Sequence, residues 1–143
     1  FQTRATGGIG RGYKVDRQEV VGVVTALEEW LTANHEDRFA AQEQRIHTIT
    51  RRLRDVPTVE TELVLGDRSP WMRLSITVDE KALGKSARSV VQALKDGEPS
   101  IMVSTTSRMF AEGDPNVISL MVHTLRPGED ELLAERLHQE LAR

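Results

Sequence analysis

The chain has 143 residues, of which 38% are hydrophobic, 29% are charged and only 4% are aromatic. This is the composition of a soluble globular protein with one domain, or one domain and an appended segment, and it excludes a disordered or fibrous chain. The formal charge of −3 provides no overall basic field that would attract nucleic acid or an anionic membrane. Because the sequence has no cysteine, it excludes disulfides, thiolate catalysis and cysteine-ligated zinc or iron–sulfur centres.

Hydropathy and the first residues bear on where the protein resides. No apolar run approaches the roughly 20 residues that span a bilayer. The sequence begins Phe1-Gln2-Thr3-Arg4, with neither an initiator methionine nor the apolar core of a signal peptide. We therefore expect a cytoplasmic protein, and the missing methionine is also compatible with a piece of a longer chain.

Two helices are predicted after a glycine-rich start. Residues 1–14 have no apolar period and are predicted to form a loop. A helix is expected after Asp16, an N-cap residue with Glu19 three positions on. Its apolar residues share one face: Val20, Val23, Val24, Leu27, Trp30 and Leu31. A break at residues 32–35 separates it from a second amphipathic helix, which is expected to end before Pro57.

The pattern changes to that of strands after Pro57. Residues 58–65 and 71–78 are strand candidates, and the turn-forming residues between them predict a hairpin. Helical spacing returns over 83–94, and Gly97 is well placed to end that helix.

The last third of the sequence predicts two more strands and a helix. The strands are expected at 100–105 and 117–124, joined by a loop rich in turn residues. The helix opens with acidic residues after Pro127-Gly128, where the helix dipole favours them. Its apolar stripe is Leu133, Leu137 and Leu141.

These elements predict an α+β fold. A long N-terminal helical segment precedes a two-layer small domain of order ββ-α-ββ-α, which occupies residues 57–143. Because amphipathic helices must bury one stripe, we expect them to cover one face of a small, mostly antiparallel sheet.

The glycine-rich run before the first helix is not a dinucleotide-binding fingerprint. That fingerprint needs a preceding apolar strand and a third glycine at fixed spacing, whereas Tyr13 occupies the third position. Arg11 and Lys14 lie in this run, just before a helix N-terminus, and exposed amides with two cations can hold an anion. A tail with solvated charges is the alternative, and the residue types leave both open.

Other candidate sites are weaker. The histidines have no metal-ligand spacing: they are His35, His47, His123 and His138. The arginine-rich stretch 45–54 is surrounded by acidic residues, so a solvated or interface face is expected rather than a nucleic-acid surface. The hydroxyl residues of 100–107 have no histidine or acid at a telling distance, which argues against a hydrolase triad.

Three motifs in order resemble one enzyme family. They are GIGRGYKVDRQEVVG at 8–22, LKDGEPSI at 94–101 and TLRPGE at 124–129. They are similar to segments of the selenocysteine synthase-like family of pyridoxal-phosphate (PLP) enzymes, which includes L-seryl-tRNA(Sec) selenium transferase and amino-sugar-acid ammonia-lyases such as D-glucosaminate-6-phosphate ammonia-lyase. In that family the first segment follows the PLP-binding lysine and leads into the helix that joins the large domain to the C-terminal small domain.

The resemblance implies that this chain is the C-terminal part of such an enzyme. The Schiff-base lysine, the Asp that pairs with the pyridinium nitrogen and most phosphate contacts would belong to a large domain that is not present in this chain. The lysines here lie in no resembling segment: they are Lys14, Lys81, Lys85 and Lys95. Residues 1–14 would form an active-site or interdomain loop, 15–56 interdomain helices and 57–143 the small domain.

The resemblance also assigns a binding role to two residues. Arg11 and Lys14 match a cationic pair near the active site that contacts an anionic substrate or phosphate group. Many relatives have an arginine after the Gly-x-Pro-x-Ile strand where this chain has Ser104, and the nearest arginine is Arg108. No substrate-carboxylate arginine is therefore assigned there.

The function implied is that of a parent lyase. We expect α,β-elimination on an amino acid or amino-sugar acid with PLP as cofactor, in a homo-oligomer that acts on a small molecule without membrane or nucleic acid. This chain alone is expected to be inactive, with no catalytic residue. The alternatives are a stand-alone α+β interaction or regulatory module and a parent selenium transferase acting on seryl-tRNA.

Overall fold

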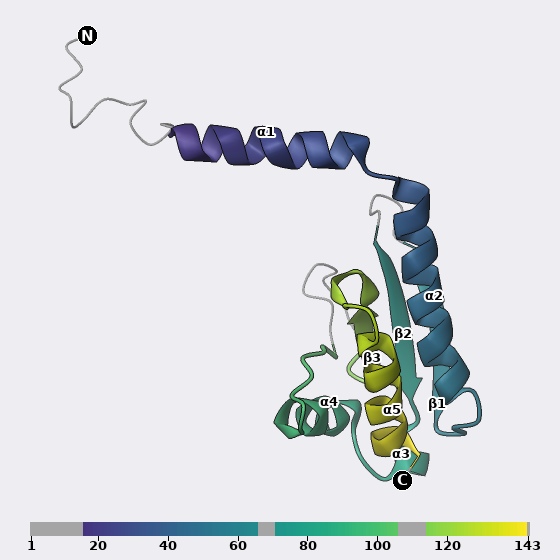
Figure 1. The fold of residues 1–143 in the computed structure, drawn as a ribbon. Helices are drawn as coiled ribbons and strands as arrows, with labels where there is room; N and C mark the ends of the chain where they lie inside the picture. The colour runs from purple at the N-terminus through teal and green to yellow at the C-terminus, as the bar shows by residue number, and fades with distance from the viewer. Residues whose placement is uncertain (1–15, 66–70, 106–113, 143) are drawn as a thin grey trace, which may run out of the picture. The chain divides into compact units, whose positions relative to one another are not determined.

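The computed structural model describes residues 16–65, 71–105 and 114–142 (Figure 1). Contacts divide the chain into two units, one up to His35 and the other from Glu36 on. The first unit contains α1 (Arg17–Thr32), and no residue of this helix is buried. The second unit contains the sheet and the hydrophobic core.

Helix α1 begins where the sequence predicts. The backbone N–H of Glu19 donates to Asp16 Oδ1 at 2.9 Å, and the N–H of Asp16 donates to Glu19 Oε2 at 3.2 Å. This reciprocal capping box satisfies two amides that the helix cannot pair internally. At the other end, the ring of His35 packs on that of Trp30, and its Nε2 lies 2.8 Å from the Trp30 carbonyl oxygen. The predicted break at 32–35 is confirmed.

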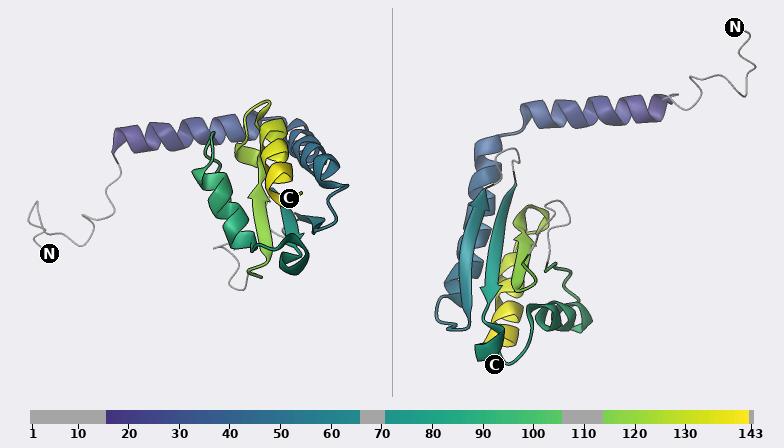
Figure 2. Two further views of the ribbon diagram at one scale, coloured as in Figure 1. Left: turned by 90° about the horizontal axis from the view of Figure 1, so that it is seen from below. Right: turned by 180° about the vertical axis from the view of Figure 1, so that it is seen from behind.

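The second unit alternates helices and strands. Its elements are α2 (His35–Leu53), which starts at the boundary, β1 (Val59–Leu65), β2 (Met72–Val78), α3 (Glu80–Leu83), α4 (Ala87–Asp96), β3 (Val117–Met121), the 3₁₀ turn η2 (Val122–Thr124) and α5 (Glu129–Leu141). The three strands form one antiparallel sheet of order β1-β2-β3. Helices α2 and α5 lie on one face of it (Figure 2), so the predicted α+β class is confirmed.

The core forms because strand and helix periods meet at that face. In β2, Leu74, Ile76 and Val78 are buried, and Leu74 pairs with Leu120 of β3. The helices supply the opposing layer of buried side chains: Ile46, Ile49 and Leu53 from α2, Val90 and Leu94 from α4, and Leu133, Leu137 and Leu141 from α5. All three leucines of the predicted stripe in α5 are therefore in the core.

The expected strand at 100–105 is not formed. The N–H of Ile101 donates to the Leu94 carbonyl at 2.9 Å, which holds the segment against the end of α4 instead of along β3. Only Ser104 reaches β3, as an isolated bridge in which the Ser119 N–H donates to its carbonyl at 2.8 Å. The last predicted strand is also shorter, because the chain turns into η2 after Met121.

The helix expected over 83–94 is divided in two. Gly84 adopts φ +77° and ends α3, a left-handed conformation that favours glycine. Helix α4 then starts at Ala87, behind the N-cap Ser86. Gly97 does end α4, but with φ −80° and ψ 176°, so it is not a left-handed cap. Its lack of a side chain instead leaves room for the guanidinium of Arg136, which a β-carbon there would meet.

Polar side chains tie the helices to the strands at a few buried points. Gln42 of α2 is 3% exposed, and its Oε1 accepts the N–H of Met72 at 3.0 Å, at the first residue of β2. Thr58 donates to the last carbonyl of α5, that of Leu141, at 2.9 Å. Because buried polar groups destabilise a fold unless they are paired, these contacts also fix where each element begins and ends.

Replacing the buried glutamine should measurably destabilise the second unit. We expect Gln42→Leu to lower the free energy of unfolding by about 1–3 kcal/mol, because the Met72 N–H loses its acceptor while it stays buried. Gln44→Leu, at an exposed position of the same helix, is the matched control. Urea denaturation of both variants measures the difference, and equal midpoints would contradict the assigned role of Gln42.

Candidate functional site

The residues predicted to bind an anion lie outside the described part of the chain. Arg11 and Lys14 precede residue 16, and Arg108 falls between 105 and 114. Their assignment as a binding pair therefore stays a prediction. Ser104, the position where relatives carry an arginine, is described and exposed.

The sheet register places Arg73 on the same sheet face as Ser104, which the sequence pattern did not indicate. Ser104 pairs with Ser119, and Ser119 pairs with Ser75 of β2, so three serines cross the sheet in one row. This row lies on the face opposite the core, since side chains alternate along a strand. Arg73 follows on the same face of β2, two positions from Ser75, and is half-buried. Glu62 of β1 pairs with Ser75 in the same row, so this face combines hydroxyls with charges of both signs.

Two aromatic rings stack at the end of the sheet where β2 begins and β3 ends. The rings of Trp71 and His123 are stacked, with centroids 4.4 Å apart, and the Arg38 guanidinium lies 5.5 Å from the Trp71 centroid. The Nδ1 of His123 is buried and makes no hydrogen bond within the described residues. Burial lowers the pKa of His123, and the nearby charge of Arg38 lowers it further.

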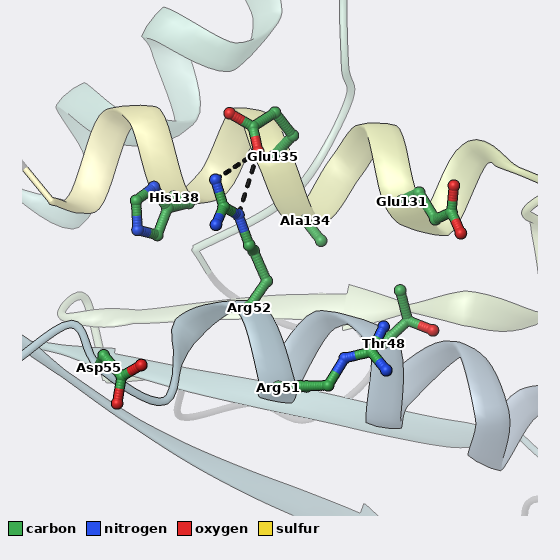
Figure 3. Close-up of a pocket in the computed structure, with 8 residues that line it drawn as sticks. All are labelled: Thr48, Arg51, Arg52, Asp55, Glu131, Ala134, Glu135 and His138. Atoms are coloured by element: carbon green, nitrogen blue, oxygen red, sulfur yellow. Dashed lines mark hydrogen bonds and ion pairs between the residues drawn. The ribbon is translucent and has the colours of Figure 1, made fainter.

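A groove opens on another side of the second unit, between α2 and α5 (Figure 3). Its volume is about 360 Å³. The lining residues are Thr48, Arg51, Arg52, Asp55, Glu131, Ala134, Glu135 and His138. Arg52 crosses the groove and donates to Glu135 Oε2 from Nη2 at 2.6 Å and from Nε at 3.0 Å. The hydrogen bond from Arg52 lowers the pKa of Glu135 most, and the hydrogen bond from Gln139 lowers it further.

The other charges of the groove are not engaged in the same way. Arg51, Asp55 and Glu131 are exposed and form no ion pair among the residues that the structure describes. The groove therefore combines one closed ion pair with charges of both signs that are left to solvent.

Across 16–65, 71–105 and 114–142, no group of three or more His, Asp or Glu side chains could hold a metal ion. Of the lysines in these ranges, Lys81 and Lys95 are exposed, and the Lys85 ammonium is paired with Glu140 at 2.9 Å. Within the same ranges, no helix has the length and apolarity that a membrane span requires.

Removing the arginine above Trp71 should raise the pKa of His123. In Arg38→Gln we expect a partial rise towards the ordinary value of 6.5, because burial still disfavours the charged ring. NMR titration of the ring protons measures it, with Arg54→Gln at the exposed end of α2 as control. Since the unfolded chain binds this proton more readily than the folded one, stability should also fall as the pH drops below 6.5. An unchanged pKa in Arg38→Gln would contradict the electrostatic contact.

Comparison with known proteins places the fold. No family model matches the chain. A 5'-C-glycyluridine monooxygenase-decarboxylase from Streptomyces sp. is 28% identical over 137 residues, which cover 94% of this chain and 33% of that protein. The solved structure of D-glucosaminate-6-phosphate ammonia-lyase is similar with a TM-score of 0.62 and 24% identity, over 94% of this chain and 34% of the other.

The chain thus spans about a third of the length of each of these two proteins. The structural likeness extends over nearly all residues of this chain. The similar structure is that of an ammonia-lyase, the kind of enzyme that the three motifs indicate. The resemblance inferred from those motifs is therefore confirmed: the chain has the fold of a part of D-glucosaminate-6-phosphate ammonia-lyase.

Proposed function

We propose that the chain is the C-terminal small-domain part of a PLP-dependent enzyme that acts on an amino acid or amino-sugar acid. The observation that supports this most is the likeness to D-glucosaminate-6-phosphate ammonia-lyase over 94% of the chain at a TM-score of 0.62. The parent would be a lyase that catalyses α,β-elimination. Residues 1–14 would form an interdomain loop at the active site, 15–56 the interdomain helices and 57–143 the small domain.

The catalytic residues of the proposed enzyme would lie outside this chain. About two thirds of each compared protein has no counterpart here. The lysines that the structure describes are exposed or ion-paired, which fits a chain that does not itself bind PLP covalently. We therefore propose that PLP is held by a large domain, that this chain alone is inactive, and that the parent self-associates.

The names of the two relatives narrow the substrate class. One acts on D-glucosaminate 6-phosphate, a phosphorylated amino-sugar acid, and the other on 5'-C-glycyluridine, a glycyl group attached to a nucleoside. Both are α-amino acids on a sugar skeleton. We propose the same class for the parent of this chain, with Arg11 and Lys14 contacting the carboxylate or phosphate. An arginine fork binds such groups through two hydrogen bonds, whereas a lysine acts as a point charge.

The second relative also favours a second reaction class. Its name describes a monooxygenase-decarboxylase, and its identity to this chain is 28%, compared with 24% for the ammonia-lyase. A parent that oxidises and decarboxylates its amino-acid substrate is therefore the other candidate. Assays of the full-length protein on one substrate separate the two, because α,β-elimination followed by hydrolysis of the resulting imine releases ammonia without consuming oxygen or releasing carbon dioxide.

Full-length protein from the natural reading frame should carry a Schiff base that this chain lacks. We expect an absorbance band at visible wavelengths, where the polypeptide itself does not absorb. Borohydride reduction should remove this band and raise the intact mass by that of the bound cofactor. The 143-residue chain of 16.0 kDa, purified in the same way, should show neither. If the reading frame encodes no further domain and the protein shows no band, the proposal fails and the stand-alone module replaces it.

The anion-binding role of the N-terminal segment is tested in the same full-length protein. We expect Arg11→Ala to raise the KM for an anionic substrate about 10- to 100-fold, because a hydrogen bond to a charged group is worth about 1.5–3 kcal/mol. The melting temperature should hardly change, because the proposed role of Arg11 is in substrate binding and not in folding. Arg17→Ala, at the exposed start of α1, is the matched control. An Arg11→Ala variant with unchanged kinetics would exclude this role.

A further inference from the structure

The groove between α2 and α5 has the properties of a small-molecule site that the proposed function does not use. Its volume of about 360 Å³ falls within the roughly 300–1,000 Å³ of ligand pockets. It lies wholly within the second unit, between two helices whose inner faces are anchored in the core through Ile49, Leu53, Leu133 and Leu137. Both walls are therefore held in place by the hydrophobic core.

The two walls carry opposite charges. Helix α2 contributes Arg51 and Arg52, and α5 contributes Glu131 and Glu135 (Figure 3). Arg52 and Glu135 satisfy each other across the groove, both with side chains 46% exposed. This pair occupies the middle of the groove.

On one side of the Arg52–Glu135 pair, one cationic and one anionic side chain have no ion-pair partner among the described residues. Arg51 and Glu131 line the same part of the groove, together with Thr48 and Ala134, in the view of Figure 3. Neither Arg51 nor Glu131 has an ion-pair partner among the described residues. Ala134 has only a methyl group and is 2% exposed, so the floor between the charges is small and apolar.

Charge complementarity selects the ligand. A free anion would approach Arg51 but would be repelled by Glu131 and Glu135, and a free cation would be repelled by Arg51 and Arg52. A molecule that carries both charges on adjacent atoms meets no such repulsion. Its carboxylate can accept the two parallel N–H donors of a guanidinium, and its ammonium can donate to a carboxylate.

We propose that this groove binds a zwitterionic α-amino acid, with its carboxylate on Arg51 and its ammonium on Glu131. The hydroxyl of Thr48 borders the same space, and the side chain of the amino acid lies over Ala134 or towards solvent. The site is independent of the proposed function, because it requires neither PLP nor the rest of a larger enzyme.

The binding is tested by NMR titration of the 143-residue chain with glycine and with L-serine. We expect amide shifts confined to residues 48–55 and 131–138, with a dissociation constant of roughly 30 mM or more, because each solvent-exposed charge contact contributes at most about 1 kcal/mol. Acetate and methylammonium, which each carry one of the two charges, should bind about fivefold more weakly. If glycine and serine produce no shifts, or if the single-charge probes match them, the proposal is wrong.

Charge reversal supplies the sharper control. Arg51→Glu and Glu131→Arg should each abolish the shifts, whereas the double variant Arg51→Glu/Glu131→Arg should restore them, because a zwitterion can bind in the reversed orientation. Arg54→Glu changes the net charge by the same amount at an exposed residue that does not line the groove, and it should leave binding unchanged. Binding that survives in both single variants, or that is lost equally in Arg54→Glu, would overturn the assignment.

Discussion

The second unit depends on the central strand β2. This strand pairs with both β1 and β3, and three of its side chains, Leu74, Ile76 and Val78, are buried beneath the helices. Because side chains alternate along a strand, a slip of one residue would bring Arg73 and Ser75 into the core. The Met72 N–H held by Gln42 opposes such a slip at the start of the strand. Burial of this one face therefore sets the register, and the register places Arg73 and Ser75 on the other face.

The hydrophobic core determines where the polar side chains of the second unit lie. On the sheet face opposite the helices, the register gathers Arg73 with Ser75, Ser119 and Ser104. On the helix side, packing of α2 beside α5 leaves a charged groove at their outer edges, with only Arg52 and Glu135 paired across it. The two regions differ in composition: hydroxyl side chains predominate on the sheet face, whereas charged side chains line the groove.

Three short motifs and the structural likeness point to the same kind of enzyme. Each of the three motifs is short, and the identity to the compared proteins is 28% and 24%. The structural likeness nevertheless covers 94% of the chain, and all of it corresponds to about a third of an ammonia-lyase. A fold by itself does not imply a reaction. For that reason the proposed chemistry is assigned to the parent enzyme and is tested there, while the groove is tested on the chain in hand.

The sequence by itself determined the element types and most boundaries, because these depend on local periodicity and capping. Asp16 and Glu19 predicted the start of α1, the alternation in 71–78 predicted β2, and Leu133, Leu137 and Leu141 predicted the buried stripe of α5. Only the tertiary structure decided that 100–105 lies against α4, since the Ile101–Leu94 hydrogen bond joins partners that no local pattern links. It alone placed Arg73 on the same sheet face as Ser104 and Arg51 in the same groove as Glu131, because sheet register and helix packing bring together residues that are far apart in the sequence.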